Sequence, residues 1–317
     1  MKHSISGRVL WLAVTAAAAL AAAALRRWQL NSAFEKYTGL AIPGAQSSVI
    51  LICVLVMIGA GLAIMALLRR PVPEQVRWNQ VFLSAGDRAF PILEIAAAFF
   101  AIAAAPALFI VGVDRFQIYQ DALKAHAQNS AVQIPTDNGL LTLATAGGAF
   151  LAALGLLQTG RDSMNPGRRG RGGFSITLPG VAGCIWLMES FRTHAANPVR
   201  WDYAPQLLAI VLGMAFYMDF AGMSAGMARP RRLLWTAGMT AVFSAVALVT
   251  AASELAARSA AGLSLLCAQL GDVLLLLSQT LAAIGVLWRL PPSLNGLPEL
   301  SPDPELIQEI QEDTDDE

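Results

Sequence analysis

The sequence predicts an all-α, polytopic transmembrane helical bundle of eight spans, with the N-terminus and the C-terminus both in the cytoplasm. Two observations support this fold class. Hydrophobic residues make up 56% of the 317 residues and charged residues only 14%, about half the charge of a typical soluble domain. The apolar residues also gather in eight stretches without Lys or Arg, separated by loops that alternate between arginine-rich and arginine-poor.

The eight stretches are long enough to cross a bilayer. Hydrocarbon offers the backbone no hydrogen-bond partner, so an apolar run of about 20 residues is expected to be a spanning helix. The predicted spans are Val9–Leu25, Ser47–Leu68, Phe90–Val113, Gly139–Thr159, Phe174–Phe191, Tyr203–Met227, Leu233–Ala252 and Gly262–Trp288. They form a membrane domain over residues 9–290, which follows a short cytoplasmic N-terminus at residues 1–8.

The basic residues predict the orientation. Segments counted alternately from the N-terminus hold 14 and 8 Lys or Arg residues. The positive-inside rule then places both termini in the cytoplasm, in the plasma membrane, with anionic lipid facing the basic cytoplasmic turns. Arg26 and Arg27, on the outer side directly after the first span, oppose this orientation. Residues 1–25 also have the features of a signal peptide, whose cleavage would leave seven spans in the same orientation.

Three connecting segments are informative. The outer segments Arg26–Gln46 and Asp114–Asn138 carry apolar residues at helical spacing and are expected to form short amphipathic helices on the bilayer surface. The arginine-rich and glycine-rich segment Arg161–Gly173 separates the first four spans from the last four. Its place between two spans favours a flexible turn at an anionic leaflet, so no nucleic-acid partner is expected.

The C-terminal segment, residues 291–317, is acidic. Pro291 is expected to end the last span, because proline lacks the N–H that a helix needs. From Glu299 to Glu317 there are nine acids and no Lys or Arg. A disordered cytoplasmic tail is the simplest interpretation, and a docking peptide for a basic cytoplasmic protein partner is the alternative.

Four ionisable residues at membrane depth are candidate proton or cation sites, because such groups are costly to bury: Glu94, Glu189, Asp219 and Asp272. For Glu189 the simplest explanation is an ion pair with Arg192, three positions along the same helix face. Asp219 and Asp272 have no Lys or Arg within their own spans, and burial favours a neutral, protonated carboxyl. Such a carboxyl either bonds a neighbouring helix or carries a proton during transport.

A candidate outer vestibule lies at the mouth of the sixth span, where Trp201, Asp202 and Tyr203 follow one another. Aromatic residues at this level are typical of the belt that anchors a membrane protein at the interface. The alternative is an entrance for a small molecule.

The sequence predicts no catalytic residue, metal site or cofactor. Its three histidines lie in loops, its three cysteines lie in separate spans, and it contains no HExxH, CxxC, G-x-S-x-G or Walker motif. The leading interpretation is a non-catalytic membrane component or regulatory subunit that docks through its tail. A secondary transporter or permease-like protein that uses Asp219 and Asp272 is the alternative. An enzyme acting on lipid-linked substrates lacks an identifiable nucleophile.

Overall fold

The chain folds as a bundle of α-helices. The computed structural model describes residues 2–35, 40–68, 78–82, 88–164, 172–195, 202–224, 227, 229–257 and 263–294. Within these ranges it contains eight long helices and one short one, which are α1 (Lys2–Ser32), α2 (Gln46–Leu68), α3 (Trp78–Val81), α4 (Ala89–Gln128), α5 (Leu140–Met164), α6 (Gly172–Ala195), α7 (Ala204–Ser224), α8 (Pro230–Ala257) and α9 (Leu263–Ser293). The all-α prediction is confirmed.

Seven of these helices are long and apolar enough to cross a membrane, namely α1, α2, α4, α5, α7, α8 and α9. The fifth predicted span corresponds to α6, which is not among the seven. Its C-terminal part carries Glu189, Arg192 and His194, which lower its hydropathy. A multi-pass membrane protein is therefore supported, while the eighth span and the orientation stay predictions.

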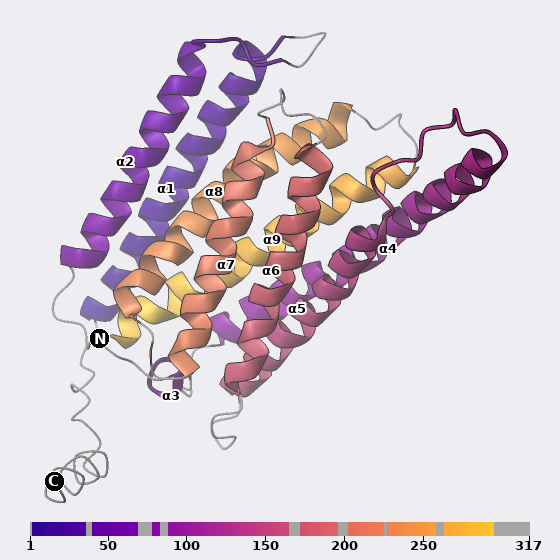
Figure 1. Cartoon of the computed structure of the whole chain (residues 1–317). Helices are drawn as coiled ribbons and strands as arrows, with labels where there is room; N and C mark the ends of the chain where they lie inside the picture. Colours follow the sequence, from indigo (N-terminus) through magenta and orange to yellow (C-terminus); the bar gives the residue numbers. More distant parts are fainter. Residues whose placement is uncertain are drawn as a thin grey trace, which may run out of the picture.

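Six of the long helices form a closed ring. Each helix from α4 to α8 contacts the next one in sequence, and α9 closes the ring by packing against α4. The α1–α2 hairpin packs on the outside of this ring against α8, along one edge of the molecule in Figure 1. The bundle is thus built from two helices plus six, and the arginine-rich segment between α5 and α6 does not divide it into halves.

Burial follows this arrangement. In α8, 78% of the residues in the apolar stretch are buried, against 17% in α1 and in α2. The outward face of α2 exposes Ile52, Val56 and Met57, as expected for side chains that contact lipid tails. The hairpin therefore lies at the periphery, packed against α8 and, through α1, against α9.

An aromatic cluster closes one end of the ring, which is the cytoplasmic, or inner, end in the predicted orientation. Trp78 and Phe82, in and just after α3, pack with Phe90 of α4 and Phe220 of α7, with ring centroids 4.5–6.3 Å apart. Arg289 of α9 holds α3 in place, because its Nε donates a hydrogen bond to the Val81 carbonyl at 2.8 Å. These four rings are called the inner aromatic cluster below.

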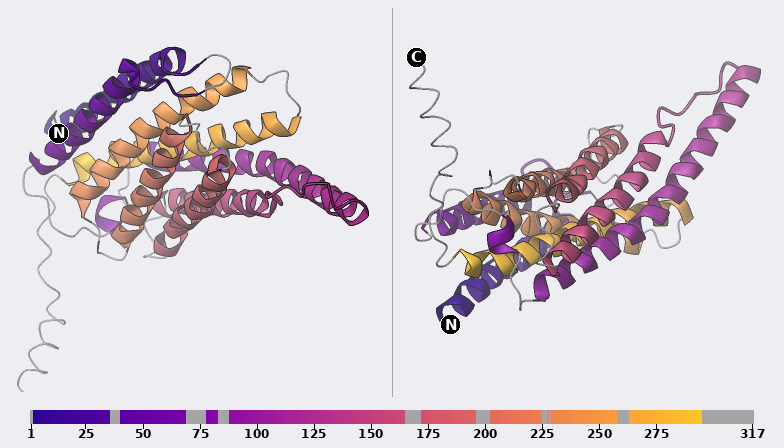
Figure 2. Two further views of the ribbon diagram at one scale, coloured as in Figure 1. Left: turned by 45° about the horizontal axis from the view of Figure 1, so that its top comes forward. Right: turned by 90° about the horizontal axis from the view of Figure 1, so that it is seen from below.

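The prediction of a separate surface helix in Asp114–Asn138 is wrong. Helix α4 continues without a break through Pro106 to Gln128, which makes it about 60 Å long at 1.5 Å per residue. Its outer part extends beyond the neighbouring helices in both views of Figure 2. Hydropathy predicts only the part of a helix that lies in lipid. The more polar residues after Val113 continue the same helix, so the hydropathy limit was not the end of the helix.

The segment Arg26–Gln46 differs from its prediction in the same way. Helix α1 continues to Ser32, and an isolated bridge then pairs Phe34 with Ala41. Arg26 is only 1% exposed. Its guanidinium donates to Thr250 Oγ1 of α8 at 2.9 Å, to Gln29 Oε1 at 2.5 Å and to the Asp202 carbonyl at 2.5 Å.

These bonds explain how Arg26 can follow the first span at the end of the bundle that is predicted to lie outside. Its charge is taken up by three acceptors inside the protein and does not face the lipid surface, where the positive-inside rule operates. The side chain also ties α1 to α8. Whether residues 1–25 are retained stays a prediction, which favours a retained span.

The prediction that Pro291 ends the last span is wrong by three residues. Helix α9 includes Pro291 and Pro292 and ends at Ser293. A proline removes only one N–H from the helix, and the buried side chains of Leu290 and Leu294 hold this last turn against the bundle. The acidic tail, from residue 295 onward, lies outside the described residues.

Candidate functional site

A polar cavity of about 120 Å³ lies near the outer end of the ring. All six ring helices contribute to its lining, and three carboxylates face it: Glu189 of α6, Glu254 of α8 and Asp272 of α9. Since about 10–15 Å³ on this measure admits one water, the outer cavity has room for several waters or for a small molecule. Two of the predicted site residues, Glu189 and Asp272, are thus brought to one place.

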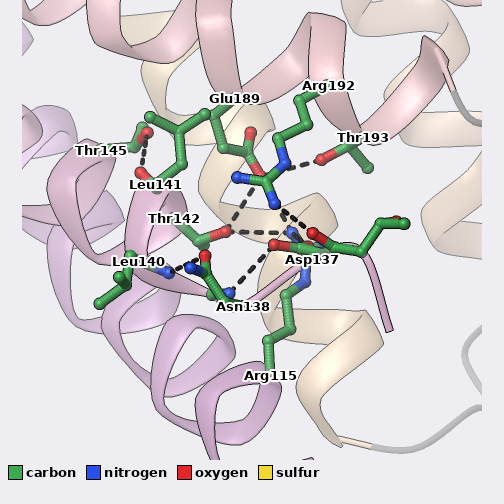
Figure 3. Close-up of polar contacts among 12 residues, drawn as sticks. Arg115, Asp137, Asn138, Leu140, Leu141, Thr142, Thr145, Glu189, Arg192 and Thr193 are labelled. Atoms are coloured by element: carbon green, nitrogen blue, oxygen red, sulfur yellow. Dashed lines mark hydrogen bonds and ion pairs between the residues drawn. The ribbon is translucent and has the colours of Figure 1, made fainter. Parts of the chain in front are cut away.

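Arg115 of α4 organises one wall of the outer cavity (Figure 3). Its Nη1 lies 3.1 Å from Glu189 Oε1, 3.0 Å from Asp137 Oδ2 and 3.0 Å from Thr142 Oγ1. The hydroxyls of Thr142 and Thr193 each donate a further hydrogen bond to Glu189 Oε1 at 3.2 Å. Glu189 is therefore held as a carboxylate by one cation and two hydroxyls.

The ion-pair partner of Glu189 differs from the one expected. Arg192 donates to the backbone carbonyl of Thr136, and the ion pair found in the described part of the chain joins Glu189 to Arg115. The expected i,i+3 pair depends only on spacing within one helix. The observed pair connects residues 74 positions apart, on two helices that the ring brings together.

Asp272 occupies the deeper part of the outer cavity. Its Oδ1 accepts a hydrogen bond of 2.9 Å from Nε1 of Trp186, a buried residue of α6. The charged groups that act most strongly on Asp272 are two other carboxylates, Glu189 and Glu254. Three acids of like charge in one cavity repel one another, and this repulsion favours a bound cation or proton.

Glu254 is linked to the same helix as Asp272. The amide of Gln269, one turn before Asp272 on α9, donates to Glu254 Oε2 at 3.2 Å.

At the edge of the cavity, the rings of His194 and Tyr203 stack with centroids 4.6 Å apart. Tyr203 of the predicted vestibule therefore lines the outer cavity. Asp202 contributes its carbonyl to Arg26, and Trp201 lies outside the described residues.

The structure separates Asp219 from Asp272. Asp219 lies near the inner end of α7, where its Oδ1 is 3.0 Å from Nε of Arg232 in the first turn of α8. The hydroxyl of Thr236 donates to the other oxygen at 3.2 Å. The Arg232 side chain is 62% exposed, so this pair sits at the edge of the bundle. Asp219 thus has a local partner that its own span does not contain.

Glu94, the fourth predicted residue, has neither a cavity nor a partner. It is fully buried in the second turn of α4, and neither carboxylate oxygen has a hydrogen-bond partner among the described residues. The four predicted acids therefore occupy three different settings. Glu189 and Asp272 share the outer cavity, Asp219 forms an ion pair at the inner edge, and Glu94 is buried alone.

Sequence reasoning missed Arg115, Trp186 and Glu254. Arg115 was assigned to a surface segment, and Glu254 lies two residues beyond the predicted end of its span. One signal was present on α9, because Gln269, Asp272 and Gln279 recur at i, i+3 and i+10 and so share a helix face. A polar face on an apolar span predicts that the face points into the protein.

Metal-ligating side chains are dispersed over the described part of the bundle. No group of three or more His, Cys, Asp or Glu side chains within the described ranges is placed to hold a metal ion. Cys53, Cys184 and Cys267 are free thiols on three different helices. Comparison with known proteins gives no further guide, since no protein family, no curated protein and no solved structure matches the chain.

Proposed function

We propose that this chain is a permease-like membrane protein whose outer cavity binds a small organic cation, an amine. The supporting observation is that Glu189, Glu254 and Asp272, from three helices, line one cavity that holds a single arginine. A bound ammonium would contribute the missing positive charge and the donors that carboxylates accept. Sequence reasoning ranked a non-catalytic component first, and the cavity favours its alternative.

The proposal depends on the low dielectric of the membrane interior. Unpaired carboxylates there are expensive, and proteins retain them at membrane depth mainly for substrate and ion pathways. Arg115 pairs with Glu189, and the charged groups that act on Asp272 are the carboxylates Glu189 and Glu254. Asp272, whose Oδ1 is held by the Trp186 N–H, is therefore the acid best placed to meet a cationic solute.

The proposed topology has eight spans with both termini in the cytoplasm and the outer cavity facing outside. Helix α6 is included as a span because it packs between α5 and α7 in the ring and so lies at the same depth as they do. The basic turns at the inner end would face anionic lipid of the plasma membrane. This orientation gives the outer cavity access to solutes from outside the cell.

The test is thermal stability of the purified protein in detergent during titration with ethanolamine and with choline. Ethylene glycol and the uncharged carbon isostere of choline serve as size-matched controls. A ligand at one hundred times its dissociation constant stabilises the folded state by about 2.7 kcal/mol. We expect stabilisation by at least one amine and none by its neutral control, with the effect lost in Asp272→Asn. Equal effects of amines and neutral analogues would overturn the proposal.

A second candidate is a regulatory subunit that docks through its acidic tail, which carries nine acids and no basic residue from Glu299 to Glu317. Its partner would be a basic cytoplasmic protein. Deletion of residues 295–317 leaves every described helix intact and separates the two candidates. The regulatory candidate predicts loss of function in cells after this deletion and a nearly silent Asp272→Asn, whereas the permease predicts the reverse.

A further inference from the structure

Glu94 is the most deeply buried carboxyl of the four predicted acids. It lies on α4, its side chain is 0% exposed, and both oxygens lack a hydrogen-bond partner among the described residues. Native proteins pair nearly all buried polar groups, so an acid left without a partner calls for an explanation. The setting of Glu94 differs from that of the outer acids, each of which has a donor within hydrogen-bond distance.

Glycines make the space that the Glu94 carboxyl occupies. A Cβ atom built on Gly285 of α9 would lie 3.3 Å from Glu94 Oε1, and one built on Gly160 of α5 would lie 3.5 Å from Glu94 Cβ. Tyr217 of α7 is the titratable residue on which the charge of Glu94 acts. The charged residues nearest to Glu94 along the packed helices are Arg88 at the start of α4, Arg161 and Asp162 directly after Gly160 on α5, and Arg289 on α9, whose Nε bonds the Val81 carbonyl.

An ionised Glu94 has no hydrogen bond or ion pair among the described residues to offset its charge. Burial of an uncompensated carboxylate costs several kcal/mol even after the protein relaxes, whereas a protonated carboxyl is neutral. The carboxyl also sits at membrane depth, where water cannot solvate it from the side. This pocket therefore holds Glu94 with its proton.

A second, smaller cavity lies between Glu94 and the outer cavity. It has a volume of about 40 Å³ in the centre of the ring and is lined by Tyr217, Ser278, Gln279 and Trp186 among others. Trp186 bonds Asp272, and the charge of Glu94 acts on Tyr217. The central cavity is thus lined by one residue that bonds Asp272 and one that senses the charge of Glu94.

The two acids are too far apart for direct exchange of a proton. Asp272 and Gly285, which faces Glu94, are thirteen residues apart on α9, or about 20 Å at 1.5 Å per residue. Since roughly 10–15 Å³ admits one water, the central cavity has room for about three waters, which at about 2.8 Å per hydrogen bond cover roughly half of this distance. Gln279 is fixed beside it, because its Nε2 donates to the Ala209 carbonyl at 2.9 Å and to Ser244 Oγ at 2.7 Å.

The inner side of Glu94 is closed. Phe90, one helical turn before Glu94, belongs to the inner aromatic cluster, which fills the inner end of the ring with four packed rings. Phe90 and Phe220 are almost completely buried, at 1% and 0% exposed. A proton on Glu94 therefore meets packed aromatic rings on the inner side and a polar cavity on the outer side.

We propose that Glu94 is an inner proton-binding site, which exchanges its proton with the outer cavity through the central cavity. The step is a transfer of H⁺ between the Glu94 carboxyl and water in the central cavity, with no other bond made or broken. This proposal goes beyond the amine site and does not require it. A proton site of this kind is what a carrier needs to couple solute movement to a proton gradient.

The first test is infrared spectroscopy of the purified protein in lipid, which detects the C=O stretch of a protonated carboxyl. We measure this in an Asp272→Asn background, so that a protonated Asp272 does not contribute, and expect such a band there and its loss when Glu94→Gln is added. Asp219→Asn is the matched control, and it should keep the band, because Asp219 is ion-paired with Arg232. If Glu94→Gln does not yield a folded protein, Glu94→Asp should shift the band. A band unaffected by either Glu94 variant, or no band, would overturn the proposal.

The second test follows the same band after transfer into D₂O. Exchange of the carboxyl proton shifts the band, and we expect this shift to be slowed by Ser278→Leu, which fills the central cavity. Phe82→Ala, which loosens the inner aromatic cluster, should leave the wild-type rate unchanged. If Ser278→Leu leaves the exchange rate unchanged, the proton does not pass through the central cavity. If Phe82→Ala accelerates exchange, the proton reaches the inner side. Either result would overturn the proposal. Neither the carboxyl band nor its exchange rate depends on amine binding. These results can therefore be interpreted even if the outer cavity does not bind an amine.

Discussion

The outer and inner ends of the ring surround carboxyl groups with opposite environments. At the outer end, Glu189, Glu254 and Asp272 line a cavity, and each accepts a hydrogen bond from a neighbouring helix. At the inner end, Glu94 is buried beside four packed aromatic rings, without a hydrogen-bond partner among the described residues. The outer acids therefore face a cavity and have donors, while the inner acid is enclosed and has none within the described ranges.

This difference shows that membrane depth alone does not assign a role to an acid. Asp219 and Asp272 have the same residue type and similar apolar sequence neighbours, yet one forms an ion pair with Arg232 and the other faces a cavity. Partners and accessible volume decide between structural and functional roles. Changing one partner or one acid at a time should therefore have different effects on stability and on amine binding at the two ends.

The largest loss of stability is expected from Arg115→Met. This change leaves Glu189, whose side chain is 11% exposed, as a buried carboxylate without its cation. Breaking a buried ion pair costs about 3–5 kcal/mol, and we expect about 3 kcal/mol because Arg115 keeps a quarter of its side chain exposed. The free energy of unfolding in mixed micelles measures the effect.

The double variant Arg115→Met/Glu189→Gln is the control for this first prediction. It removes both charges, so it should recover most of the lost stability. A single-variant loss of about 1 kcal/mol or less, typical of an exposed pair, would show that the outer end does not depend on this ion pair.

A smaller loss is expected from Gln279→Leu at the centre of the ring. The Gln279 amide bonds both α7 and α8, and Gly213 allows its close approach, since a Cβ there would lie 2.3 Å from Gln279 Oε1. Hydrogen bonds between membrane helices contribute on the order of 1 kcal/mol each, so we expect a loss of about 1–2 kcal/mol. Ser244→Ala removes one of the two bonds and should cost about half as much in the same unfolding measurement.

The two aspartates should differ in binding more than in stability. Asp219→Asn breaks a pair whose arginine is largely exposed, so the loss should be below about 1 kcal/mol, with amine binding unchanged. Asp272→Asn keeps the acceptor for Trp186 and so should also be mild in stability, but it removes a charge from the outer cavity. Amine titration monitored by thermal stability should therefore fail only in Asp272→Asn. Loss of binding in both variants would remove the distinction between the two acids.

Much of the fold could be predicted from the sequence because hydropathy reports directly on lipid exposure. The predicted span Ser47–Leu68 differs from α2 (Gln46–Leu68) by a single residue, and that helix carries mostly lipid-facing side chains. The ends of α1 and α4 could not be predicted in this way. Arg26 stays in the helix because Thr250 and the Asp202 carbonyl accept its hydrogen bonds, and both lie far away in the sequence.

The candidate site shows the same limit. Glu189 and Asp272 could be identified as costly acids in apolar surroundings, but their partners Arg115 and Trp186 lie 74 and 86 positions away. Those pairings exist only because α4, α6 and α9 meet in the ring. Conversely, Glu94 could be identified as a costly acid within an apolar span, but not as the most deeply buried of the four. Its burial depends on Gly160 and Gly285, whose missing side chains no local pattern connects to it.

The smallest change in stability is expected from Glu94→Gln, although this residue is the most buried of the acids. Glutamine matches the shape of a protonated glutamate, and Glu94 loses no hydrogen bond because it makes none among the described residues. We expect a change of less than about 1 kcal/mol in the free energy of unfolding near neutral pH, against about 3 kcal/mol for Arg115→Met. A clear gain of stability would mean that the wild-type carboxyl is ionised at that pH, because glutamine would then relieve a buried charge. A loss as large as that of Arg115→Met would mean that Glu94 has a strong partner, and the contrast between the two ends of the ring would disappear.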